Sequence, residues 1–417
     1  MESQEIKRLI VEYQQFVETV EIIERPIELE AAANYIFVGL RRSGKSYIMY
    51  QIIQNLLKSG KKKEDILFVN FEDERFVGAQ TGDLSRIMDC YNEMYDTHPV
   101  IFLDEAQTIP GWQKFVRRLA DQKYSVFVSG SNAEMLSSEI ATTLGGRFII
   151  HEVYPYSFSE FLTANQVSIT KNWQYSSTKN TVVRLLETYL QYGGLPEILS
   201  RKSKRPWISS LYQKIFLGDI ISRYAIRNDN ALKLMVKKLA ESVMHPISHN
   251  RLANIVSSAG KKVSVSTSIE YLKYLNASWL VFGISNYAAA LGERESIKKY
   301  YFTDNGILNL FLMDGNTRLL ENIVAVNLYK KYGERVYFYN KNIEVDFYIP
   351  DSELAIQVSY DISNPDTFDR ETVAFAKLNK IAKIKRCIVI TYNEERSITA
   401  NGINIEIVPV YKWLLNE

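Results

Sequence analysis

The chain has 417 residues, which at about 150 residues per domain predicts about three domains. Hydrophobic residues make up 46% of the chain and charged residues 24%, which excludes a disordered, collagenous or fibrous protein. The formal net charge is only +2, so any contact with nucleic acid must come from local basic patches.

The two cysteines, Cys90 and Cys387, stand far apart and outside any C-x-x-C pair. This excludes a disulfide framework and a thiolate zinc site. The first residues lack the basic and apolar regions of a signal peptide, and no apolar run approaches the length of about 18 residues that a membrane span needs. We therefore expect a cytoplasmic protein without a membrane partner.

Apolar residues recur at helical spacing over residues 5–23, and Arg25-Pro26 ends this pattern, which predicts a leading helix. A β-rich run at 35–38 then leads directly into a glycine loop and a second helical pattern, YIMYQIIQNLL. The loop matches the phosphate-binding motif G-x-x-x-x-G-K-[S/T] at every fixed position. Its residues are Gly39, Leu40, Arg41, Arg42, Ser43, Gly44, Lys45 and Ser46.

This loop predicts ATP and Mg²⁺ as ligands. Glycines let backbone N–H groups surround phosphates, and the following helix adds the partial positive charge of its N-terminus. We expect Lys45 to reach the β and γ phosphates and the Ser46 hydroxyl to ligate Mg²⁺. Arg41 and Arg42 could also touch phosphate, although loop arginines commonly point into solvent.

A nucleotide site of this kind needs an acidic element in addition to the glycine loop. Two carboxylates follow the apolar run at 100–103, and this run is typical of a buried parallel strand. Asp104 is expected to hold the Mg²⁺ shell through bound water, and Glu105 to polarise the attacking water. An aspartate alone suits a nucleotide binder, whereas the glutamate after it suits hydrolysis. The pair therefore predicts an ATPase, with Lys45 and Glu105 as catalytic residues.

Two further strands are predicted at 66–71 and 124–131. Strands that alternate with helical stretches predict a parallel sheet with ligands at the carboxyl ends of its strands. Asn132 and Ser131 stand at one such end, where a polar side chain could sense the γ phosphate.

With these motifs, the N-terminal third resembles the AAA-type P-loop ATPases. In that family an arginine before the fifth strand reaches a neighbouring subunit's nucleotide, and Arg147, directly before the apolar run 148–150, matches its position. The resemblance implies a catalytic arginine finger and contact between copies of the chain; a surface arginine at a strand start is the alternative. The helical patterns at 155–200 resemble the family's helical lid.

Three helical segments between 231 and 276, followed by two β-rich runs, have the order of a winged helix-turn-helix. Residues 264–273 would form its recognition helix, where Glu270 opposes contact with phosphate. Reading of DNA and packing against protein both remain open for this module. The basic residues on or beside the helix are Lys261, Lys262, Lys273, Lys298 and Lys299.

The last hundred residues resemble the restriction-endonuclease-like fold. Its active nucleases carry an acidic residue on the first helix, an aspartate on one strand and Glu-x-Lys on the next, and Glu321 and Asp346 match the first two positions. Gln357 and Ser359 stand at the third. An amide is a weak Mg²⁺ ligand and serine carries no positive charge, so we expect no nuclease activity.

Together these regions resemble a family of bacterial and archaeal AAA-type ATPases whose C-terminal region has no settled function. We predict an α/β protein with a P-loop NTPase core and leading helix at 1–165, a helical lid and linker at 166–228, a winged helix-turn-helix at 229–315 and an α/β restriction-endonuclease-like domain at 316–417. The chain is predicted to bind and hydrolyse ATP, and its nucleotide state to reposition the C-terminal modules, with DNA, a second copy or a client protein as candidate partners. The alternative is a nucleotide-gated scaffold that acts through protein contacts.

Overall fold

The computed structural model describes residues 2–30, 33–258, 262–400 and 402–416. The chain divides into an N-terminal unit (Met1–Tyr154 with Ala277–Trp279) and a C-terminal unit (Pro155–Asn276 with Leu280–Glu417). Within these described residues, one sheet has five strands and another has nine. In the described part of the chain, no helix is long and apolar enough to cross a membrane.

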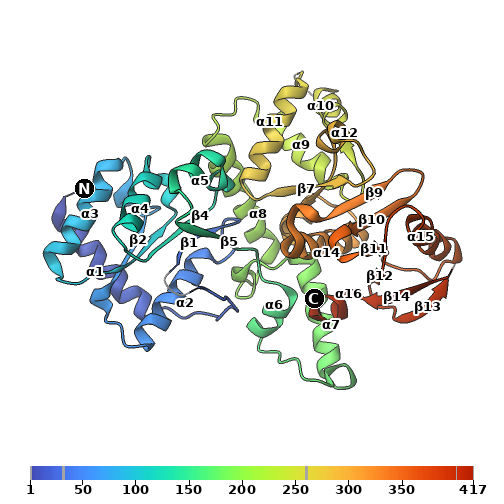
Figure 1. Cartoon of the computed structure of the whole chain (residues 1–417), viewed down its shortest axis with the longest axis horizontal. Coiled ribbons are helices and arrows are strands. Elements are labelled where there is room, and N and C mark those ends of the chain that lie inside the picture. Colours follow the sequence, from blue (N-terminus) through green and yellow to red (C-terminus); the bar gives the residue numbers. More distant parts are fainter. Residues whose placement is uncertain (1, 31–32, 259–261, 401, 417) are drawn as a thin grey trace. The chain divides into compact units, whose positions relative to one another are not determined.

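The sheet of the N-terminal unit is parallel throughout, in the strand order β2-β3-β4-β1-β5 (Figure 1). The strands predicted at 35–38, 66–71, 124–131 and 148–150 are confirmed within a few residues. The helices and strands of this unit are α1 (Ser3–Thr19), β1 (Asn34–Val38), α2 (Lys45–Lys58), β2 (Ile66–Asn70), α3 (Thr81–Met94), β3 (Val100–Asp104), α4 (Trp112–Asp121), β4 (Val126–Gly130), α5 (Ser138–Leu144) and β5 (Phe148–Glu152).

Helices cover both faces of this sheet because alternate side chains of each strand point to opposite sides. On β1, Ile36 and Val38 pack in one core with α1, α3 and α4, whereas Tyr35 and Phe37 pack in a second core with α2. All five strands run in one direction, so their carboxyl ends meet at one edge. The glycine loop follows β1, and the two carboxylates stand on the last residue of β3 and the residue after it, which brings both motifs to that edge.

The C-terminal unit contains a mixed sheet in the order β13-β14-β12-β11-β10-β9-β7-β8-β6. Its helices and strands are α6 (Phe158–Ala164), α7 (Thr178–Tyr192), α8 (Lys204–Lys214), the π-helix Ile215–Ser222, α9 (Asp229–Glu241), β6 (Ile247–Ser248), α10 (His249–Ser258), α11 (Val265–Ala277), β7 (Val281–Asn286), α12 (Leu291–Ser296), β8 (Ile297–Phe302), α13 (Asn305–Leu308), α14 (Asn316–Tyr332), β9 (Tyr337–Asn340), β10 (Glu344–Ile349), β11 (Leu354–Val358), α15 (Pro365–Leu378), β12 (Arg386–Thr391), β13 (Arg396–Ala400), β14 (Ile403–Pro409) and α16 (Val410–Asn416).

This sheet crosses the domain boundary expected at 315–316. Strand β7 pairs in parallel with β9, and the Asn286 side chain bonds the Asn340 backbone through both its amide nitrogen and its oxygen, at 2.8 and 3.0 Å. The helices α9 to α11 and the β7–β8 hairpin lie in the predicted order, with β6 added beside β8. Long-range strand pairing of this kind leaves no local pattern in the sequence, which is why the sequence suggested two separate modules.

Candidate nucleotide-binding site

The glycine loop reverses direction between β1 and α2 through backbone angles that favour glycine. Gly39 has a φ of +155° and Gly44 a φ of +102°, and Arg42 between them has a φ of +64°. A Cβ atom at Gly39 would stand 2.1 Å from the carbonyl oxygen of Val153, so no side chain fits there. Helix α2 then begins at Lys45, and its N-terminus points its free N–H groups at the loop.

Lys45 lies inside the loop rather than in solvent. Its side chain is only 3% exposed. The Nζ atom donates to the carbonyl oxygens of Gly39 and Leu40, at 3.2 Å each, and lies 3.6 Å from Oε1 of Glu105. The structure thus brings together the loop lysine and the second carboxylate, which stand 60 positions apart in the sequence.

Asp104 ends β3 and is 2% exposed. Its carboxylate accepts hydrogen bonds from the hydroxyls of Ser129 and Ser46. Burial, followed by the neighbouring Glu105 carboxylate, raises the pKa of Asp104 to about 6. A carboxylate and a hydroxyl that already meet are the oxygen donors that Mg²⁺ prefers, so Asp104 and Ser46 fit the expected ion.

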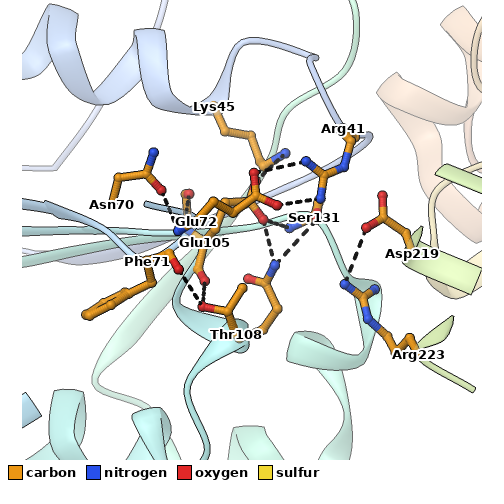
Figure 2. Close-up of polar contacts among 12 residues, drawn as sticks. Arg41, Lys45, Asn70, Phe71, Glu72, Glu105, Thr108, Ser131, Asp219 and Arg223 are labelled. Carbon is orange, nitrogen blue, oxygen red and sulfur yellow. Dashed lines mark hydrogen bonds and ion pairs between the residues drawn. The ribbon is translucent and has the colours of Figure 1, made fainter. Parts of the chain in front are cut away.

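Glu105 is held by three neighbours, two of which, Lys45 and Ser131, are labelled in Figure 2. Its Oε2 accepts hydrogen bonds from the Gln107 amide at 2.6 Å and the Ser131 backbone N–H at 3.2 Å. Its Oε1 faces Lys45. Burial alone raises the pKa of Glu105, but the charges of Lys45 and Arg41 and the two hydrogen bonds outweigh burial and lower it. Glu105 is therefore an anion of fixed orientation, as a group that attracts a water proton must be.

The other arginines of this region have separate positions. Arg41 forms two hydrogen bonds with Glu72, which follows β2, and Arg42 is exposed. Arg25 is buried and donates to the carbonyl oxygens of Ser43 and Tyr154, at 3.0 and 3.1 Å. Arg25 therefore ties the phosphate loop, at Ser43, to the segment that follows β5, at Tyr154.

Sequence analysis identified Arg25 only as the end of a helical pattern, because nothing local indicates its partners. Glu72 and Gln107 were missed for the same reason: their partners, Arg41 and Glu105, meet them only once the strands are side by side.

Asn132 and Arg147, the two other predicted site residues, are each held by a carboxylate away from the Lys45–Glu105 contact. The Asn132 side chain bonds Glu134 through both ends, at 2.9 Å each, and so caps the short helix that follows. Arg147 contacts Asp121, with 2.5 Å between Nε and Oδ1. It precedes the start of β5, which pairs in parallel with β1, so it lies at the sheet edge opposite to the phosphate loop. Five residues of strand, about 16 Å, separate the two edges.

A second group of charged side chains lies in the C-terminal unit, and we call Lys299, Glu321, Glu344 and Asp346 the carboxylate–lysine cluster. Nζ of Lys299 lies 3.7 Å from Glu321, 3.3 Å from Glu344 and 3.1 Å from Asp346. Lys299 and Glu321 are completely buried. Lys299, named above as a basic residue beside the recognition helix, is therefore buried and cannot meet DNA, and Lys261, also named there, lies outside the described residues.

Charge and burial act in opposite directions in this cluster. Burial alone lowers the pKa of Lys299, but the three carboxylates outweigh it and raise the pKa above its ordinary value. Burial and Asp346 raise the pKa of Glu321 to about 8. Lys299 therefore neutralises carboxylates that would otherwise be costly to bury.

The neighbouring strand β11 contributes hydrogen bonds and no charge. Oε1 of Gln357 accepts the backbone N–H of Asp346 at 2.8 Å, and its Nε2 donates to the Glu344 carbonyl at 3.1 Å. The Ser359 hydroxyl donates to the carbonyl of Asp361 at 3.0 Å. Gln357 thus ties β11 to β10.

Known proteins similar to this chain extend over nearly its full length. Residues 32–162 match a family model described as an AAA domain, and residues 183–318 match a domain of unknown function, DUF8612. The chain is 31% identical over 425 residues to the uncharacterized protein MJ1544 of Methanocaldococcus jannaschii, which covers 98% of this chain and 95% of that one. It is 29% identical over 395 residues to an uncharacterized protein of Haemophilus influenzae, which covers 91% and 94%. Among solved structures, the Walker-type ATPase PABY2304 of Pyrococcus abyssi has 11% identity and a TM-score of 0.40, over 74% of this chain and 95% of that one.

Proposed function

Since this chain belongs to the same family as the uncharacterized protein MJ1544 of M. jannaschii and carries an AAA domain at residues 32–162, we propose that it binds ATP and hydrolyses it to ADP and phosphate. The observation that carries the proposal is the meeting of Lys45, Asp104 and Glu105 at one edge of a parallel sheet. A lysine for phosphate, a carboxylate for a cation and a carboxylate for water are the three groups that the reaction needs.

Each residue has its own task in this proposal. Lys45 exchanges the carbonyl oxygens of its own loop for the β and γ phosphates of ATP. Ser46 and Asp104 hold the cation, and Mg²⁺ bound there would neutralise charge on the phosphates. Glu105 accepts a hydrogen bond from the attacking water and orients it toward the γ phosphate, while Gln107 keeps the carboxylate in place. Asn132 would have to leave Glu134 in order to sense the γ phosphate.

Arg147 is proposed to act on the nucleotide of a second copy. Its position at the far edge of its own sheet supports this, because a side chain there is too distant from its own phosphate loop. The arginine would have to exchange Asp121 for phosphate when the copies assemble.

Nucleotide state is proposed to reposition the C-terminal unit, which then acts on DNA or on a protein. The helices α9 to α11 and the strands β6 to β8 support a winged helix-turn-helix, with α11 as its recognition helix. On α11, Glu270 and Lys273 are both exposed, so the charge of this helix does not favour DNA strongly. The alternative, a nucleotide-gated scaffold that acts through protein contacts, uses the same nucleotide site.

ATP hydrolysis with and without duplex or single-stranded DNA separates these two functions. Stimulation by DNA would favour a DNA-directed ATPase, and equal rates would favour a partner protein. Lys45→Ala is the control, because removal of the ammonium should abolish nucleotide binding or weaken it greatly.

We further propose that the C-terminal unit has no nuclease activity. The binding of Gln357 to the backbone of β10 and the ammonium of Lys299 among three carboxylates support this proposal. A plasmid incubated with the protein and Mg²⁺ or Mn²⁺ should stay intact. Nicking that disappears in Asp346→Ala would contradict the proposal.

A further inference from the structure

Arg41 and Glu72 form a bidentate ion pair in the candidate nucleotide-binding site. Nη1 of Arg41 donates to Oε2 of Glu72 at 3.0 Å, and Nη2 donates to Oε1 at 2.6 Å. Glu72 is itself anchored, because its backbone N–H donates to Oδ1 of Asn70 at 2.9 Å. The Arg41 side chain is 13% exposed and the Glu72 side chain 36%, so the guanidinium is shielded from water while the carboxylate is partly open to it.

The pair crosses the catalytic edge of the sheet. Arg41 follows β1 and Glu72 follows β2, and the strand order places β4 and β3 between those two strands. The pair therefore passes the carboxyl ends of β3 and β4, where Glu105 and Ser131 stand, and Figure 2 shows all four residues together. The charge of Arg41 acts on Glu105 and helps to lower its pKa.

On the basis of the proposed ATPase function, we propose that this ion pair distinguishes ATP from ADP. The structure pairs Arg41 with Glu72. The γ phosphate, which must face Glu105 for hydrolysis, offers two oxygens to the same guanidinium and takes Arg41 from Glu72. ADP has no group at this position, so the pair stays intact when ADP is bound. Arg41 is thus a specificity-determining residue, and Glu72 a positioning residue that competes for it.

Affinities for the Mg²⁺ complexes of AMPPNP, a non-hydrolysable ATP analogue, and of ADP test this competition by calorimetry. Arg41→Gln should weaken AMPPNP binding about tenfold, and Glu72→Gln should tighten it about fivefold, because one charge-assisted contact is lost or gained. Both variants should bind ADP within about twofold of the parent protein. In the Arg41→Gln background, Glu72→Gln should have no further effect on AMPPNP affinity, because there is then no guanidinium for Glu72 and the γ phosphate to compete for.

The matched control is Arg8→Gln, which removes an exposed arginine of the same unit, paired with Glu12 on α1. It should leave both affinities unchanged. Equal weakening of AMPPNP and ADP by Arg41→Gln, or weaker AMPPNP binding in Glu72→Gln, would overturn the inference. ADP affinity also shows that each variant is folded. Suppose that the parent protein binds both nucleotides, that Lys45→Ala binds neither, and that Arg41→Gln weakens AMPPNP and ADP equally: then only this inference fails. If the parent protein binds neither nucleotide, the proposed function fails as well.

Discussion

Replacement of Gly39 by alanine tests whether the phosphate loop is fixed as the structure has it. The new Cβ would stand 2.1 Å from the carbonyl oxygen of Val153 and 3.3 Å from Oγ of Ser43. The Val153 carbonyl belongs to backbone, and the Val153 N–H bonds the Val38 carbonyl at 2.7 Å. The clash therefore cannot be relieved by a side-chain rotation; the chain after β5 must separate from the end of β1.

The expected cost has two parts. Alanine at a positive φ costs about 1–2 kcal/mol. Forcing atoms into a well-packed place adds about 1–3 kcal/mol. The sum is about 2–5 kcal/mol of unfolding free energy. Gly60→Ala is the matched control, because Gly60 also has a positive φ, +101°, but a Cβ there has nothing within 4 Å. Only the first part of the cost applies to it.

Urea denaturation of both variants, followed by circular dichroism, measures the difference. Gly39→Ala should lose about 1–3 kcal/mol more stability than Gly60→Ala. It should also lose ATP binding, because the displaced loop no longer directs its N–H groups at the phosphates, whereas Gly60→Ala should bind normally. Equal losses of stability in the two variants would refute the loop geometry described above.

Three further changes test other parts of the molecule. Burial raises the pKa of Asp304 from 3.8 to about 6, so the folded chain retains a proton that the unfolded chain loses. About 3 kcal/mol of stability should therefore disappear between about pH 4 and pH 6. By urea denaturation, Asp304→Asn should show a decline smaller by about this amount, and a decline equal to that of the parent would contradict the assignment. Lys299→Met should cost about 3–5 kcal/mol, less with Asp346→Asn added, because it leaves the largely buried Asp346 carboxylate without its counter-charge. An unchanged urea midpoint would contradict this. A mixture of Arg147→Ala and Lys45→Ala chains should hydrolyse ATP although each alone does not, and no recovery would contradict action between copies.

The N-terminal unit was largely predictable because its signals are local. The glycine loop, the strand before it and the helix after it occupy consecutive residues, and the apolar runs of a buried parallel sheet are continuous. The positions of Lys45, Asp104 and Glu105 followed from one rule, that the carboxyl ends of parallel strands share an edge.

The contacts that hold these residues in place were not predictable, because they join distant segments. Nothing beside Glu72 indicates that its partner is Arg41 in the loop, and nothing beside Gln107 indicates that it holds Glu105. Lys299 belongs to a strand of the presumed winged module, so sequence reasoning placed its charge near DNA rather than among buried carboxylates. The pairing of β7 with β9 was hidden for the same reason.

The most direct test of the central claim is the steady-state rate of ATP hydrolysis by the full chain and by Glu105→Gln, with Mg²⁺. The substitution keeps the size of the side chain but removes the charge that orients the water, so ATP should still bind while turnover falls by about a hundredfold or more. ATP binding measured on the same samples separates a lost reaction from a lost site. Turnover by Glu105→Gln at the parent rate would contradict the account.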